Sequence, residues 1–197
     1  MKKINERTTE YDDVDDIFLK RYSPRALSDK ALTKIELMAM FEAARWAPSA
    51  FNIQPWRFLY AIKGTPEFDL FLSFLNEGNR VWCENAGALI IGLSQKIQDD
   101  GRPSAKYSLG TGAAWENLAL QATKMNLVAH GMSGFDEKML VEKLEITDRY
   151  QVELMIAIGY HGKIEDLPEK MREGEKPNDR KKLEEIIFEG AEGAKKL

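Results

Sequence analysis

The sequence predicts an α+β fold, in which a sheet is flanked by helices. Segments with helical character and strand-like segments follow one another along the chain without any internal repeat, which favours a sheet covered by helices over a repeat array. The composition agrees, because 44% hydrophobic and 30% charged residues are typical of a folded globular protein. A chain of 197 residues is long enough for one substantial core, and we expect a single domain over residues 1–197.

The predicted helices begin and end on recognisable signals. "DDVDDIFLKR" (12–21) has its acids first and its bases last, as the helix dipole favours. Thr33 and Glu36 form a capping box, which opens a helix that ends before Pro48. Thr65 can cap a third helix, "PEFDLFLSFLNEG". The remaining two are a short amphipathic helix after Phe135 and a long helix over 110–127 with a flat face of small residues, namely Ala113, Ala114, Leu118, Ala119 and Ala122.

Three segments are predicted to be strands. "WRFLYAI" (56–62) is rich in aromatic and β-branched residues. "GALIIGL" (87–93) and "YQVELMIAIGY" (150–160) are largely continuous apolar runs, which are typical of buried strands.

The C-terminal segment has little to bury. Residues 161–180 combine charges, prolines and glycines, and they are followed by "RKKLEEIIFEG", a short helix or docking segment. An extended stretch of this length is usually functional or wraps another molecule. We therefore expect residues 161–197 to form an arm that packs on a second subunit.

Charge and cysteine content exclude several classes of function. A formal net charge of -4 argues against nucleic acid or an anionic membrane as the main partner, although a local basic pocket remains possible. Cys83 is the single cysteine and has no histidine beside it, so a small buried side chain is favoured over a catalytic thiol. His130 and His161 do not suggest a metal site, and no apolar run approaches the length of a spanning helix. A cytoplasmic location is the simplest expectation.

The stretch "RYSPRA" (21–26) could hold an anion. On an extended segment Arg21, Ser23 and Arg25 point the same way, and two guanidiniums with a hydroxyl suit a phosphate or an electron-rich ring edge. On these residues alone, a solvated basic turn is the favoured interpretation.

The loop "APSAFNIQPWRF" (47–58) is more specific. Pro48 and Pro55 bracket it and make it rigid, while Asn52 and Gln54 each carry a donor and an acceptor that could read the edge of a heterocycle. A structural turn whose amides satisfy their own backbone is equally compatible with the spacing.

Taken together, "RYSPRA" and "ARWAPSAFNIQPWRF" resemble the N-terminal signature of the flavin-dependent nitroreductase family. The resemblance continues in order through "NRVWCENAGALIIG", "WENLALQATKMNL", "GMSGF", "AIGY" and "NDRKKLEE". It implies an α+β fold with a mainly antiparallel sheet, an intertwined homodimer, and one FMN in each of two sites built from both subunits.

Site residues follow from the resemblance position by position. One subunit would bind FMN through Arg21, Tyr22, Ser23, Arg25, Asn79, Met132, Ser133, Gly134, Arg180 and Lys181, with Lys182 as an alternative neighbour of the phosphate. Its partner would contribute Pro48, Ser49, Ala50, Asn52 and Gln54. Arg25 would lie near the N1/O2 edge of the ring and Arg21 near the phosphate. Phe51 and Trp82 would line the access channel to the flavin.

The family also implies a function, namely reduction of electron-poor acceptors such as nitroaromatics or quinones by NAD(P)H through FMN, in two alternating half-reactions. The flavin would carry the chemistry, so no catalytic side chain is expected. Trp82 stands where some members have lysine and Ser133 where many have glutamate, which leaves the substrate and the choice between NADH and NADPH open. Two alternatives are a different flavin reaction, for which residues 94–110 could form a short lid, and a flavin-holding protein without turnover.

Overall fold

The centre of the molecule is a four-stranded antiparallel sheet. The computed structural model describes residues 3–4 and 7–195, and the remaining residues of the predicted domain lie outside this range. In spatial order the strands are β3 (Trp56–Ile62), β4 (Ala88–Gln95), β6 (Tyr150–Tyr160) and β5 (Leu127–Met132), and every neighbouring pair is antiparallel. The predicted α+β class, the antiparallel sheet and all three predicted strands are confirmed, two of them with the same bounds.

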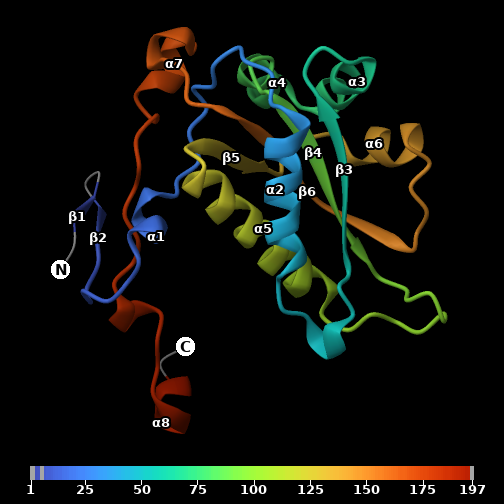
Figure 1. Cartoon of the computed structure of the whole chain (residues 1–197). Helices are drawn as coiled ribbons and strands as arrows, with labels where there is room; N and C mark the ends of the chain where they lie inside the picture. The colour runs from blue at the N-terminus through green and yellow to red at the C-terminus, as the bar shows by residue number, and fades with distance from the viewer. Residues whose placement is uncertain (1–2, 5–6, 196–197) are drawn as a thin grey trace.

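Helices cover both faces of this sheet (Figure 1). On one face lie α2 (Lys34–Arg45) and α5 (Tyr107–Lys124), and on the other lie α3 (Pro66–Phe74), α4 (Glu77–Cys83) and α6 (Glu137–Lys143). Strand β4 shows why two cores form. Its side chains alternate, so that Ile90 packs with α2 and α5 while Ile91 packs with α3 and α4.

The start signals of the helices act as predicted. Thr33 and Glu36 form the capping box of α2, and Thr65 caps α3 with Pro66 in its first turn. Helix α1 (Asp16–Lys20) is shorter than predicted and begins where the Asp15 carboxylate accepts the Ile17 N–H at 2.8 Å. In α5 the small-residue face packs inward as predicted: Ala114, Leu118, Ala119 and Ala122 are buried, and Ala113 is partly buried against the same core.

Two more of the predicted helices differ from the structure, and strand β5 was not predicted. The long helix ends at Lys124 instead of continuing to residue 127, because Asn126 adopts a left-handed φ of 57° and the chain turns into β5. The helix after Thr65 also breaks. Leu75 forms an isolated bridge with Phe135, and Asn76 starts a separate helix, α4, by accepting the Asn79 N–H on its side chain.

The two terminal segments run side by side along one edge of the molecule (Figure 1). At the N-terminus, β1 (Lys3–Ile4) and β2 (Arg7–Thr8) form a short hairpin. The C-terminal arm contains η2 (Ile164–Asp166), α7 (Glu169–Arg172), η3 (Leu183–Glu185) and α8 (Gly190–Ala194). From α7 it descends past α1 and β2. Among the described residues, no helix has both the length and the apolar character needed to cross a bilayer.

Candidate functional site

The Arg21–Ala26 segment is an extended turn fixed by the end of β6. Leu27 bridges His161, and the Gly162 N–H donates to the Ala26 carbonyl at 2.8 Å. Pro24 disfavours helical backbone at Ser23, so α1 cannot continue through the turn. Residues 21, 23 and 25 therefore occupy alternate positions, as the sequence predicts.

Both arginines of the turn are partly buried, and each has an acid nearby. The Arg21 side chain is 17% exposed, with its Nε 3.9 Å from Glu116 Oε1 and its Nη1 3.3 Å from Ser23 Oγ. The Arg25 side chain is 38% exposed, with its Nη1 3.9 Å from Glu175 Oε2. Neither ion pair is close, so both guanidiniums retain free donors.

A half-buried histidine, His130, and a buried tryptophan, Trp82, pack beneath the turn. His130 Nδ1 lies 3.0 Å from the Pro24 carbonyl, which can only accept, so this nitrogen carries the proton. Burial lowers the pKa of His130, and the charges of Arg25 and Arg21 also act to lower it. The Trp82 ring lies against His130 with ring centroids 4.7 Å apart, and Trp82 is only 2% exposed. Within one chain, Trp82 is therefore buried against His130, and its side chain is not exposed to solvent.

A third arginine, which the sequence did not single out, joins this region. Arg7 is 6% exposed; its guanidinium donates to the Leu19 carbonyl at 2.9 Å, to the Arg21 carbonyl, and to the Asn178 carbonyl at 2.9 Å. Burial lowers the pKa of Arg7, and the charges of Arg180 and Arg21 lower it further. Arg21 and Arg180 therefore both lie close enough to Arg7 for their charges to act on it, while the Asp179 carboxylate acts in the opposite direction. Such a cluster suits a doubly charged anion.

Of these three arginines, Arg180 lines a cavity of about 400 Å³. Its lining residues come from both terminal segments and are Thr8, Glu10, Asp179, Arg180, Lys181, Lys182 and Glu184. Arg180 is exposed, and its Nη1 contacts only neighbouring atoms of the arm, among them Asn178 Oδ1 at 3.1 Å. The predicted phosphate-binding residues Arg180 and Lys181 thus lie on one cavity, and Lys182 lies there too.

Asn79 and the Met132–Gly134 turn form a second unit. The Asn79 side-chain amide donates to the Gly134 carbonyl at 3.0 Å, and the Asn76 N–H donates to the same oxygen at 3.1 Å. Met132 is buried, with its sulfur 3.4 Å from Cys83, whereas Ser133 is exposed. Of this turn, Ser133 is the residue whose side chain faces outward.

The loop between α2 and β3 is tightly organised. Ser49 Oγ accepts the Gln54 N–H at 3.0 Å, and the Gln54 side-chain amide donates to the Asn52 carbonyl at 3.1 Å. Phe51, Asn52 and Gln54 have left-handed φ values of 51°, 55° and 52°. Such backbone is uncommon outside glycine and persists only where the surroundings fix it. Phe51 is nevertheless 96% exposed.

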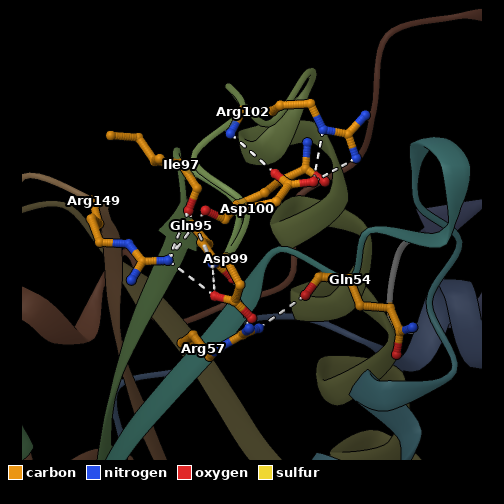
Figure 2. A network of polar contacts seen from close by, with 9 residues as sticks. Gln54, Arg57, Gln95, Ile97, Asp99, Asp100, Arg102 and Arg149 are labelled. Atoms are coloured by element: carbon orange, nitrogen blue, oxygen red, sulfur yellow. Dashed lines mark hydrogen bonds and ion pairs between the residues drawn. The ribbon is translucent and has the colours of Figure 1, made fainter.

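Polar contacts extend from this loop to the segment at 96–104 (Figure 2). Arg57 donates to the Gln54 carbonyl at 2.9 Å and to Gln95 Oε1 at 2.7 Å. Asp99 Oδ1 accepts from both Gln95 Nε2 and Arg149 Nη2 at 3.0 Å. This segment lies within residues 94–110, the expected position of a short lid, and is tied to the end of its own sheet.

The predicted site residues fall into two groups within one chain. Figure 1 places the 48–54 loop at the lower end of the sheet and α4, which carries Asn79, at the upper end. A single chain accordingly brings together the turn, the arm and the N-terminal segment, but leaves the loop apart.

These features define a class of protein: an antiparallel α+β fold in which arginines of the turn, the arm and the N-terminal segment lie near a cavity lined by both basic and acidic side chains. Comparison with known families identifies the class. The Nitroreductase family model matches residues 18–67 and 62–160, which together cover most of the chain, and the chain belongs to this family.

Individual relatives agree with the family assignment. Protein DrgA of Synechocystis sp. is 29% identical over 191 residues, covering 82% of this chain and 89% of that protein. The Streptococcus pyogenes protein named "Putative NAD(P)H nitroreductase Spy0809" is 25% identical over 172 residues, covering 72% and 86%. A crystal structure described as an oxidoreductase containing FMN is 43% identical, has a TM-score of 0.92, and covers 96% of this chain and 98% of that one.

Proposed function

We propose that this chain is an FMN-dependent NAD(P)H oxidoreductase that reduces electron-poor acceptors such as nitroaromatics and quinones. The single observation that carries the proposal is that Arg21 of the turn and Arg180 of the arm both lie close enough to Arg7 for their charges to act on it, because two guanidiniums brought to one region can hold a phosphate where the family signature calls for one. The 43% identity to an FMN-containing oxidoreductase over nearly the full chain supports it.

The residues of the chain would bind and orient the cofactor. Arg21, Arg180 and Lys181 or Lys182 would hold the phosphate, and Arg25 would lie at the N1/O2 edge of the ring. Tyr22, Ser23, Asn79 and the Met132–Gly134 turn would complete the contacts from this subunit. When bound, FMN supplies the redox chemistry, taking a hydride from NAD(P)H and passing two electrons to the acceptor. One NAD(P)H and one proton are consumed for each two-electron reduction of the acceptor.

A second copy of the chain would complete the site. Large hydrophobic side chains are exposed on and beside α2 and α5: Ile35 (83%), Trp46 (71%), Phe51 (96%) and Leu109 (73%). A soluble monomer rarely leaves such a set uncovered. We propose that this face pairs two subunits, so that Pro48, Ser49, Ala50, Asn52 and Gln54 of one approach the turn of the other, with Phe51 at the access channel.

The test begins with protein freed of bound flavin. We expect FMN to bind at micromolar concentration or tighter and to confer NADH or NADPH oxidation that accelerates with a nitroaromatic or a quinone. Riboflavin, which lacks the phosphate, should bind at least tenfold more weakly, and Arg180→Ala should reduce that difference, because charge-assisted hydrogen bonds contribute about 1.5–3 kcal/mol each. Absence of FMN binding contradicts the proposal. Binding without reduction by either nucleotide would instead support a flavin-holding protein.

A further inference from the structure

A buried carboxylate on the C-terminal arm contacts the backbone of the Arg21–Ala26 turn. Glu175 Oε1 accepts the N–H groups of Arg25 at 2.5 Å and of Ala26 at 2.7 Å, while its Oε2 lies 3.9 Å from Arg25 Nη1. Its side chain is only 6% exposed. Acidic side chains are seldom buried unless they are paired. Glu175 has two backbone N–H donors and one guanidinium as partners, so the contact stabilises its buried charge.

Hydrogen bonds before and after Glu175 fix the position of the arm and of this carboxylate. Before Glu175, the Arg172 guanidinium donates to the Leu167 carbonyl at 2.9 Å and to the Glu165 carbonyl at 2.8 Å, and Leu167 is buried in the core. The Glu175 N–H donates to the Arg172 carbonyl at 3.1 Å. After it, Arg7 bonds the Asn178 carbonyl. The arm is thus fixed on both sides of Glu175.

The charge of Glu175 acts on several groups around the turn. Burial raises the pKa of the Tyr22 hydroxyl, and the Glu175 carboxylate adds to that rise. Burial lowers the pKa of His130, and the same carboxylate opposes the lowering. Because Glu175 is buried, solvent and salt screen its charge far less than that of the half-exposed Glu116 beside Arg21.

We infer that Glu175 is a positioning residue that holds Arg25 in place and, by offsetting its positive charge, lowers the reduction potential of the flavin. The inference rests on the proposed function. Arg25 at the ring edge would favour the reduced, anionic flavin, and a buried negative charge 3.9 Å from its guanidinium weakens that effect. The C-terminal arm would thereby set both the geometry and the charge at the ring.

Two substitutions at Glu175 separate its role in holding the turn from the effect of its negative charge on the flavin. Glu175→Gln keeps a carbonyl oxygen for the two N–H groups but removes the charge, whereas Glu175→Ala removes both. Glu173→Gln is the matched control, because Glu173 is exposed on the same arm two residues earlier. In the flavin-free proteins we expect amide hydrogen exchange at Arg25 and Ala26 to be at least tenfold faster in Glu175→Ala and close to wild type in the other two. Unchanged exchange in Glu175→Ala would overturn the positioning role.

The flavin-bound proteins test the charge. For Glu175→Gln we expect FMN affinity near that of the wild type and a midpoint potential shifted in the positive direction, where a tenfold gain in relative affinity for reduced FMN corresponds to about 30 mV. Glu173→Gln should leave the potential unchanged. A potential in Glu175→Gln equal to or below that of wild type overturns the charge role. A wild-type chain that fails to bind FMN would refute the proposed function, and amide exchange would still decide whether Glu175 positions the turn.

Discussion

A Cβ atom added at Gly134 would lie 2.4 Å from Asn76 Nδ2 and 2.6 Å from Asn79 Nδ2. Gly134→Ala must therefore displace the amides that define the second unit of the candidate site. We expect a loss of about 1–3 kcal/mol in the free energy of unfolding, measured in urea, together with weaker FMN binding.

Gly78 offers the matched control for that change. It lies exposed within α4, and an added Cβ would meet only Asn76 Oδ1, at an ordinary contact distance of 3.7 Å. Gly78→Ala should stabilise the protein by about 0.5–1 kcal/mol, because alanine loses less backbone entropy on helix formation. A Gly134→Ala protein as stable as wild type would contradict the close packing of this turn.

His130 gives the stability a defined pH dependence. Burial and the neighbouring arginines lower its pKa in the folded state, so between the folded and unfolded pKa values the unfolded chain binds more protons. Stability should consequently fall as pH decreases through about 6.5, the usual value for histidine. His130→Phe should flatten this slope in urea unfolding between pH 5 and 8.

His161 must be treated in parallel, since burial also lowers its pKa. The double variant with His161→Phe should be flatter than either single variant. A wild-type slope that survives in His130→Phe would show that His130 is not held neutral in the fold.

At the scale of elements, the loop between α2 and β3 depends on one hydroxyl. Ser49 Oγ accepts the Gln54 N–H and closes a loop that holds three residues at left-handed φ. Ser49→Ala should lower the free energy of unfolding, measured in urea, by about 1 kcal/mol. It should also weaken FMN binding, because the loop loses the hydrogen bond that fixes its shape. Ser73→Ala is the control, since Ser73 is exposed on α3, far from the loop in sequence. Equal FMN affinity in the two variants would contradict a role for the loop in binding.

Local signals predicted most elements, and long-range contacts explain the rest. The capping box at Thr33 and the β-rich stretch at 56–62 depend on neighbouring residues, so the sequence alone predicts them. Strand β5 was not predicted, because the helical pattern before it continues without proline or glycine. The signal for the end of the helix is Asn126, a residue that tolerates left-handed backbone.

The residues of the candidate site also divide into those that a local motif predicts and those that only long-range contacts bring to the site. Arg21 and Arg25 stand in a recognisable motif, whereas Arg7 and Glu175 reach the turn from opposite ends of the chain, with sequence separations of 14 and 150 residues in their contacts to Arg21 and Arg25. Neither stands in a local pattern that predicts such a contact. Only the folded arrangement of the terminal segments brings them there.

At the scale of the whole molecule, the exposed apolar face around α2 and α5 predicts self-association. Leu109→Asp should leave the subunit folded, because the side chain is 73% exposed, but it should shift sedimentation toward the monomer and weaken FMN binding. Leu59→Asp is the control. Leu59 pairs with Ile91 in the sheet and so lies on the opposite face, with 38% exposure. Dimers that persist in Leu109→Asp would contradict this interface.

In the proposed dimer, the turn of one subunit and the loop of the other form each flavin site. Complementation tests this arrangement, by mixing and refolding an Arg21→Ala/Arg25→Ala chain with a Ser49→Ala/Asn52→Ala chain, each defective in FMN binding alone. A mixed dimer then carries one site with an intact turn and an intact loop. Random pairing in a twofold dimer should restore FMN binding at about a quarter of the sites. No restored binding, in mixtures shown to contain mixed dimers, would mean that each site lies within one chain.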